Sequence, residues 1–220
     1  MIKLIVFLFS FCGVYGYFTL PGKCPTNVAA KDDFRLEDFY GKWYQAYFYS
    51  SDGQRKNNCS VIELGIEPFD SYKSGASPIH LNQSRVDRGL FHRYSIATVR
   101  PPASGSVSGS LELEYTFKNA PRRLMTRNYK LEILATNYNF YATAYTCQYS
   151  PLIDKHYIYV WILSRKTSLN DVSKELALKS LKNIGINEEK LVKDDQTKCS
   201  PKYYEDTPTE PTTFRYSIPI

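Results

Sequence analysis

The amino-acid sequence predicts an all-β protein, an eight-stranded up-and-down antiparallel barrel with one C-terminal α-helix packed on the outside. Three observations support this fold class. Strand-like runs rich in β-branched and aromatic residues follow one another between turn clusters. The run Leu111 to Phe117 alternates apolar and polar residues, which is typical of a strand with one buried face. A single helical pattern follows the last run, and this order favours a barrel with an interior site.

The first 16 residues predict a secretory signal peptide. Lys3 supplies the positive start, Leu4 to Cys12 the apolar segment, and Val14 to Gly16 the small-residue cleavage pattern. The apolar run is shorter than the roughly 20 residues that a membrane-spanning helix needs. We therefore expect a secreted, extracellular protein with a barrel domain at 17–200. Proline and threonine dominate from Pro201, so we expect a disordered tail at 201–220.

A short helical turn at Phe34 to Phe39 is expected before the first strand. That strand opens at Gly41, where glycine permits a bend, and carries Trp43, one of two tryptophans. Each strand connects to the next by a segment short enough for antiparallel neighbours. The eight expected strands are 43–49, 59–66, 78–85, 90–100, 111–117, 129–135, 141–149 and 156–164.

One helix is expected after the strands, capped by Asn170 or Ser168 and ended by Gly185. A short final strand at Leu191–Val192 is expected before Cys199. The apolar stripe of the helix at helical spacing consists of Val172, Leu176, Ala177, Ser180, Leu181 and Ile184.

Four cysteines remain after Cys12 leaves with the signal: Cys24, Cys59, Cys147 and Cys199. In an oxidising compartment they predict two disulfides, with three connectivities open. Their wide spacing does not resemble a zinc site, so no metal is expected. The net charge of +6 comes with no nucleic-acid-binding motif, and no nucleic-acid partner is expected.

Three local patterns in order resemble the lipocalin family. They are the first-strand motif Gly41-Lys42-Trp43-Tyr44, the turn Thr136-Asn137-Tyr138 with Asn in place of the family's Asp, and Arg165 after the last strand. The resemblance covers about Gly22 to Cys199. Within the family the chain is most similar to apolipoprotein D-like and arthropod bilin-binding lipocalins, through the segments Gly22 to Pro25, Ile133 to Thr136, Tyr145 to Cys147 and Trp161 to Leu163.

The resemblance implies the disulfides Cys24–Cys147 and Cys59–Cys199. It also implies a structural motif at the closed end of the barrel, where Arg165 lies over Trp43. The residues expected to contact a ligand are Leu64, Asn82, Phe117, Tyr145, Tyr159 and Trp161, with Leu113, Tyr115 and Tyr157 as further inward-facing candidates. Core filling is the alternative for each of these side chains, because a barrel of eight strands has room for one small ligand.

Two sequons are present, Asn58-Cys59-Ser60 and Asn82-Gln83-Ser84. Asn82 either faces a ligand inside the barrel or carries a glycan, and one role excludes the other. Asn58 precedes the second strand and is the expected glycosylation site.

The loops at the mouth of the barrel are rich in cations. A basic rim favours an anionic amphiphile, such as a fatty acid or a bilin with propionates. The alternative is that these cations only solvate the rim. The cations are Arg55, Lys56, Arg85, Arg88, Arg122, Arg123, Arg127 and Lys155, against the acidic Asp52, Asp87 and Asp154.

The predicted function is that of a secreted carrier for a small hydrophobic ligand: a bilin, fatty acid, sterol or retinoid. No cofactor is required, although a bilin is a candidate bound ligand, and no membrane span is expected. Two alternatives stay open: a secreted protein that acts through its loops on a receptor or a second copy, and an enzyme similar to prostaglandin isomerases. The enzyme needs a free cysteine in the barrel, whereas all four are expected to be paired, so no catalytic residue is assigned. His80, His92 and His156 lack the context of a haem ligand.

Overall fold

The computed structural model describes residues 19–53, 57–66, 78–87, 91–100, 107–116 and 126–199. The predicted signal peptide at 1–16 and the predicted tail at 201–220 lie outside the described residues, as does Phe117.

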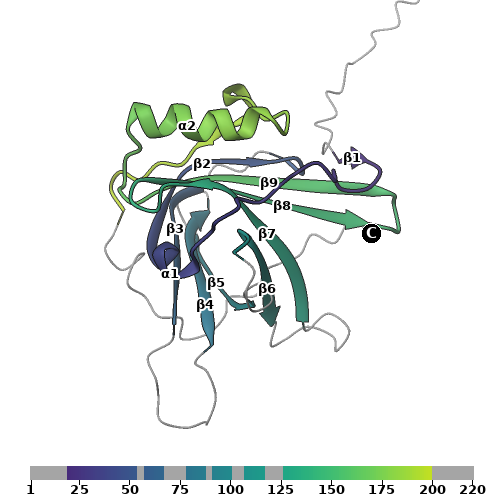
Figure 1. Ribbon diagram of the computed structural model, residues 1–220, viewed down its shortest axis with the longest axis horizontal. Coiled ribbons are helices and arrows are strands. Elements are labelled where there is room, and N and C mark those ends of the chain that lie inside the picture. Colours follow the sequence, from purple (N-terminus) through teal and green to yellow (C-terminus); the bar gives the residue numbers. More distant parts are fainter. Residues whose placement is uncertain are drawn as a thin grey trace, which may run out of the picture.

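Eight antiparallel strands form a closed barrel (Figure 1). Consecutive strands are neighbours, and β9 pairs with β2 to close the sheet, which confirms the predicted fold class. Within the barrel both edges of every strand have a neighbouring strand. The barrel strands are β2 (Gly41–Ser50), β3 (Asn57–Ile66), β4 (Ile79–Asp87), β5 (Phe91–Arg100), β6 (Ser110–Thr116), β7 (Thr126–Thr136), β8 (Tyr141–Ser150) and β9 (Lys155–Ser164).

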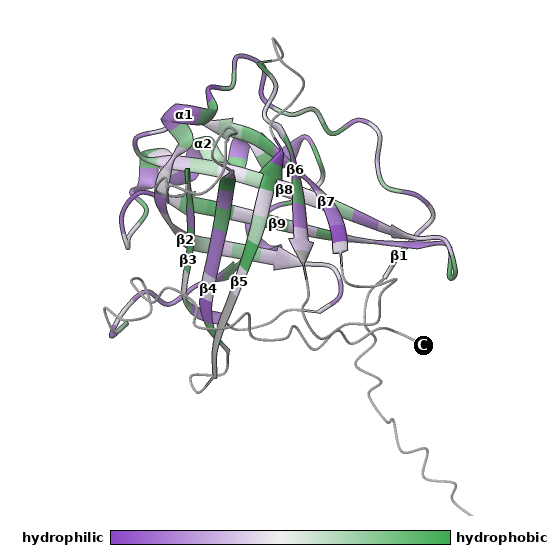
Figure 2. Cartoon of the chain, turned by 90° about the horizontal axis from the view of Figure 1, so that it is seen from below, coloured by the Kyte–Doolittle hydropathy of each residue, from purple (hydrophilic) through white to green (hydrophobic). Residues whose placement is uncertain are grey.

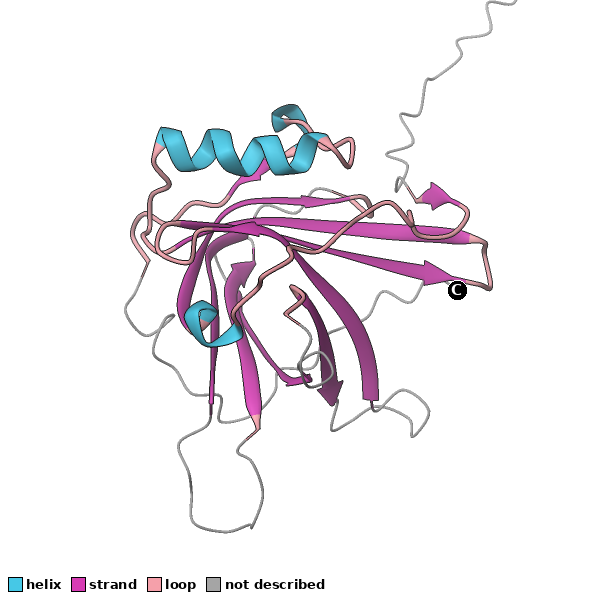
Figure 3. Ribbon diagram, viewed as in Figure 1, coloured by secondary structure: helices cyan, strands magenta, loops and turns pink. Residues whose placement is uncertain are grey.

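Smaller elements surround the barrel (Figure 3). Helix α2 lies across the outside of the barrel, and the short β1 pairs with the start of β9. In the described part of the chain, no helix combines the length and apolar character required to cross a membrane. These elements are β1 (Leu20–Pro21), α1 (Leu36–Phe39), α2 (Asp171–Lys182), η2 (Glu188–Lys190) and β10 (Val192–Lys193).

The barrel wall separates two apolar clusters, because successive side chains of a strand point to opposite faces. Hydrophobic and hydrophilic residues accordingly mix along the strands in Figure 2. The inner cluster includes Trp43, Leu81 and Leu113. The outer cluster, which includes Val160 and Ile162, lies between the wall and α2.

Helix α2 begins where the Asn170 side chain accepts a hydrogen bond from the Ser173 amide at 2.8 Å. Ser173, Ala177 and Leu181 form its buried face. Two members of the predicted stripe lie elsewhere: Val172 is 69% exposed and Leu176 is 45% exposed. The prediction was wrong for these two residues. The small side chains of Ser173 and Ala177 bring this face of the helix against the wall, and Val172 and Leu176 lie beside the contact.

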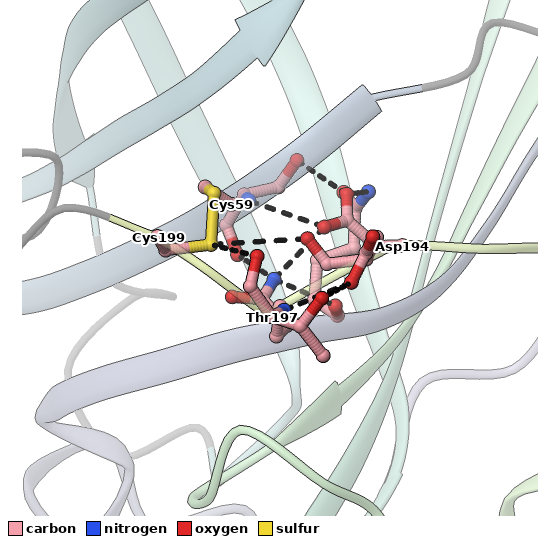
Figure 4. The surroundings of a disulfide bond; sticks show 8 residues. Cys59, Asp194, Thr197 and Cys199 are labelled. Atoms are coloured by element: carbon pink, nitrogen blue, oxygen red, sulfur yellow. Dashed lines mark hydrogen bonds between the residues drawn. A yellow bond between two sulfur atoms is a disulfide. The ribbon is translucent and has the colours of Figure 1, made fainter. Parts of the chain in front are cut away.

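The C-terminal segment completes the wall between β2 and β3. These strands pair only from Gly41 to Tyr44 and from Val61 to Leu64. Beyond that point β10 pairs with β2, and Asp195 bridges to Asn58 of β3. The Cys59–Cys199 disulfide ties the segment to β3, as Figure 4 shows. The second disulfide is Cys24–Cys147, so the pairing agrees with the one that the resemblance implies.

A buried carboxylate holds the same segment in place. Asp194 is 4% exposed and accepts hydrogen bonds from Gln45 Nε2 at 2.7 Å, Ser60 Oγ at 2.5 Å and Gln196 Nε2 at 2.9 Å. Burial raises the pKa of Asp194 to about 6, although the bonds from Ser60 and Gln45 oppose this shift.

Candidate ligand-binding site

Trp43 and Arg165 lie together at one end of the barrel, here called the closed end, where β2 begins and β9 ends. Trp43 is fully buried, and Arg165 Cζ lies 3.7 Å from the centre of its indole ring. The indole Nε1 donates to the Phe39 carbonyl at 2.9 Å, and the Phe39 ring stacks on Trp43 at 4.8 Å. Helix α1, which carries Phe39, therefore covers this end.

Arg165 joins three backbone segments. Its Nε donates to the Tyr138 carbonyl at 2.8 Å, Nη1 to Lys42 at 3.0 Å and Nη2 to Asp38 at 3.2 Å. Burial lowers the pKa of Arg165 from its ordinary value. Gly41 has φ +92°, where a residue with a side chain is strained, and a Cβ there would lie in contact with Arg165 Nη1 at 3.4 Å.

The turn Thr136-Asn137-Tyr138 joins β7 to β8 at the closed end. Thr136 Oγ1 donates to the Tyr141 carbonyl at 2.8 Å and accepts from the Tyr138 amide at 2.9 Å. The Asn137 side-chain oxygen accepts from the Phe140 and Tyr141 amides at 3.0 and 3.1 Å. A carboxylate oxygen could accept both bonds, so Asn fits where the family motif has Asp.

The opposite end, where β2 ends and β9 begins, is here called the open end. Tyr157, Tyr159 and Trp161 of β9 point into the barrel but are only half-buried. Their outward neighbours Ile158 and Val160 are buried under the outer cluster. An inner face that is more accessible than the outer face shows that solvent reaches the interior from this end.

Strand β7 has the same pattern. Its inward side chains Arg127 and Tyr129, nearest the open end, are half-buried, whereas Leu131 and Ile133 further in are buried. On β6, Tyr115 is half-buried and Leu113 is buried. The interior is thus accessible near the open end and packed near the closed end, and the accessible half is the candidate binding site.

Aromatic rings line much of this half. Trp161 lies 5.7 Å from Phe48 and 6.3 Å from Tyr159, measured between ring centres. Tyr115 and Tyr129 meet edge to face at 5.4 Å. Such rings offer large apolar contact surfaces with few conformations to lose on binding.

Polar groups complete the lining. Tyr159 Oη donates to Asp52 Oδ2 at 3.1 Å, and Asp52 also accepts from Ser50 Oγ. Ser95 Oγ and Tyr157 Oη are buried and have no hydrogen-bond partner in the structure. Buried polar groups are usually paired, so these two are available to a ligand.

The structure places three of the predicted ligand residues in the interior. Tyr159 and Trp161 lie in the open half, whereas Leu64 is 1% exposed and packs opposite Leu81 in the inner cluster. Phe117 lies outside the described residues.

Tyr145 lies on the other side of the wall, which corrects its prediction as a ligand contact. It opposes Val160 and packs in the outer cluster near Leu181. Burial, with a smaller contribution from Glu132, raises the pKa of Tyr145 to about 12.

Asn82 is also on the outer face. Leu81 belongs to the inner cluster, so the next residue along the strand points outward. Asn82 lies between Glu63 and Ile96, and its Oδ1 is buried without a hydrogen-bond partner. This position removes Asn82 from the interior lining and leaves its sequon compatible with a glycan.

Three of the predicted rim cations are on strands and not in loops. Arg85 is on β4 on the same face as Leu81, and Arg127 is on β7 on the same face as Leu131. Alternate residues of a strand share a face, so the sequence pattern around these leucines could have predicted that both arginines point inward. Lys155 is exposed at the start of β9, and the side chain of Asp87 is not described. Arg55, Lys56, Arg88, Arg122 and Arg123 lie outside the described residues.

The described residues contain no group of three His, Cys, Asp or Glu side chains arranged to hold a metal ion. His156 Nδ1 lies 2.9 Å from the Gly22 carbonyl, where it joins β9 to the segment after β1.

A closed antiparallel barrel with an accessible, aromatic-lined interior at one end defines the class of small-ligand-binding barrels. Comparison with known proteins finds that this chain is similar to lipocalins. A model of the Lipocalin / cytosolic fatty-acid binding protein family matches residues 106–198.

Two insect proteins are similar to this chain over most of its length. Insecticyanin-B of Manduca sexta is 28% identical over 186 residues, which are 83% of this chain and 84% of that protein. The bilin-binding protein of Pieris brassicae is 24% identical over 153 residues, 70% of this chain and 72% of that protein. The solved structure of insecticyanin from the tobacco hornworm superposes with a TM-score of 0.65 at 26% identity, covering 83% of this chain and 91% of that one.

Proposed function

We propose that this protein is a secreted carrier that binds a small hydrophobic ligand in the open half of its barrel. The observation that carries this proposal is the accessibility of inward-facing side chains on β6, β7 and β9 near the open end. Apolar surface that faces an accessible interior gains free energy when a ligand displaces water from it.

Bilins, fatty acids, sterols and retinoids are the candidate ligands. The name of the bilin-binding protein states the ligand of that relative, which makes a bilin the first to test here. The carrier needs no cofactor for its activity, and it is not an enzyme. Both disulfides agree with an oxidising compartment. We further propose that the barrel domain at 17–200 follows a removable signal peptide at 1–16 and precedes a tail at 201–220.

Binding can be followed through the two tryptophans. The mature protein, purified from a eukaryotic secretory host, is titrated with biliverdin, palmitate, cholesterol and retinol. Trp161 is accessible and Trp43 is fully buried, so a ligand should quench Trp161 first, and a Trp161→Phe variant should lose most of the signal. Absence of saturable binding for every class of ligand, by fluorescence and by visible absorption, would contradict the carrier function.

One observation favours the alternative of interactions through loops. The turn between β8 and β9 carries Leu152, which is 95% exposed, and Ile153, which is 40% exposed. Apolar side chains at a loop tip are suited to contact a receptor or a second copy of the chain. Sedimentation of the wild type and of Leu152→Ser tests this: self-association that the substitution abolishes would support it.

A further inference from the structure

We propose that Arg85, Arg127 and Ser95 form a binding site for the carboxylate of an amphiphilic ligand on the inner wall of the barrel, beside the open end. This inference rests on the proposed carrier function and specifies where such a ligand places its charged group.

The strand register brings the three residues to one level. The hydrogen-bonded row that starts at Trp43, at the closed end, runs through Ile62 and Gln83 to Ser95. Barrel strands are tilted relative to the barrel axis. Paired residues on successive strands therefore lie progressively nearer to the open end from β2 to β5. Ser95 therefore lies near the open end, although the series of paired residues that leads to it begins with Trp43 at the closed end.

The same rule places the two arginines. Arg85 is one inward position beyond Gln83 along β4, in the direction of the open end. A second series of paired residues runs from Leu81 on β4 through Ala97 and Tyr115. It ends at Arg127 on β7, three strands away from β4. Arg85, Ser95 and Arg127 thus lie along an arc near the mouth, with the serine between the two cations.

Ser95 is the group that points to a missing ligand atom. Its side chain is 5% exposed, its Oγ is buried, and it has no hydrogen-bond partner. Leaving a buried hydroxyl unpaired costs on the order of 1–3 kcal/mol. A ligand oxygen beside Ser95 would accept its hydrogen.

The described charged side chains that face inward on β4 and β7 are Arg85 and Arg127. The carboxylates of the described side chains on β6 and β7 face outward, where Glu114 pairs with Arg100 at 2.5 Å and Glu132 with Lys130 at 2.8 Å. Asp52 is at the mouth but on the β9 side, bonded to Tyr159. An anion near Ser95 would meet two guanidinium groups, which bind carboxylates through paired N–H donors.

The apolar body of such a ligand would extend inward from this arc, past Tyr115 and Tyr129 towards Leu113 and Trp161. The fitting ligand is an amphiphile with one or two carboxylates at one end, oriented with that end at the mouth. Fatty acids and bilins share this chemistry.

The experiment compares each acid with its uncharged analogue: palmitate with 1-hexadecanol, and biliverdin with its dimethyl ester. Wild-type protein should bind at least one acid more tightly than its analogue. Arg85→Gln and Arg127→Gln should each weaken binding of that acid by about 10- to 100-fold, as loss of a charged hydrogen bond predicts, and leave binding of the analogue unchanged. The acid that binds more tightly than its own uncharged analogue shows whether the carboxylate belongs to a fatty acid or to a bilin.

Lys155→Gln is the matched control, because it removes an exposed cation at the same end of the barrel. Equal binding of acid and analogue, or equal effects of Lys155→Gln and the arginine variants, would overturn the carboxylate site while the carrier function stands. If the wild type binds neither acids nor analogues, the carrier function itself fails and the site with it. Circular dichroism of each variant shows whether the barrel is retained.

Discussion

The guanidinium of Arg165 lies 3.7 Å from the centre of the Trp43 indole, and this contact closes the barrel at the end opposite the candidate binding site. Trp43 is near the start of the first barrel strand, and Arg165 directly follows the last. The pair therefore joins the two ends of the barrel sequence and contributes to stability at a distance from the ligand.

Replacing Arg165 with Ala should lower the free energy of unfolding by about 2–4 kcal/mol, because a cation–π contact and three bonds to backbone carbonyls are lost together. Urea denaturation measures the change. Arg165→Lys retains the charge without the planar fork and should fall between wild type and Ala. If a folded Arg165→Ala protein binds ligand more weakly than wild type, the closed end also contributes to binding, which would contradict its purely structural role.

Gly41→Ala should destabilise the protein by about 1–2 kcal/mol, because an L-residue is strained at φ +92°. Gly65→Ala is the control: this strand glycine has open space around its Cβ position, so the substitution should be close to neutral. Equal losses in the two variants, measured by thermal unfolding, would argue against a special role for Gly41.

Asp194 should make stability depend on pH between about 4 and 6. Its pKa in the folded protein is about 6, above the ordinary value of 3.8 for an aspartate, so the folded state binds more protons in this range. Its contribution to stability is therefore greatest below about pH 4 and decreases as the pH rises through 6. The full change is about 3 kcal/mol.

Urea unfolding of wild type and Asp194→Asn from pH 4 to 7 measures this contribution. Other carboxylates titrate in both proteins, so the relevant quantity is the difference between the two curves. A difference that stays constant with pH would show that folding does not raise the pKa of Asp194.

If the predicted signal peptide is removed, the protein should contain no free thiol when it is denatured without reductant. Cys12 leaves with the predicted signal peptide, and the four other cysteines are paired. One thiol per chain would indicate that Cys12 is retained, and more than one would indicate an open disulfide.

Glycosylation at Asn58 remains a prediction. Because Asn82 points outward, its sequon is the alternative glycosylation site. Mass spectrometry before and after removal of N-glycans, with Asn58→Gln and Asn82→Gln variants, assigns the site. A glycan that persists in Asn58→Gln and is lost in Asn82→Gln would reverse the prediction.

The sequence by itself determined the fold class, because its signals are local. The alternation from Leu111 to Phe117, the turn at Thr136 to Tyr138 and the cap at Asn170 each depend on neighbouring residues. Trp43, Arg165 and the cysteines added long-range pairings, but only through resemblance to a family.

Which face of a strand meets the interior was decided by tertiary structure. β8 is buried on both faces from Tyr141 to Thr146, because α2 covers the outside, so no alternation reveals that Tyr145 points away from the barrel interior. β4 has polar residues on both faces, so Asn82 looked as suitable for the interior as Gln83. Arg85 and Arg127 became a candidate site for the same reason: the register of four strands, which no single segment encodes, brings them to one level at the mouth.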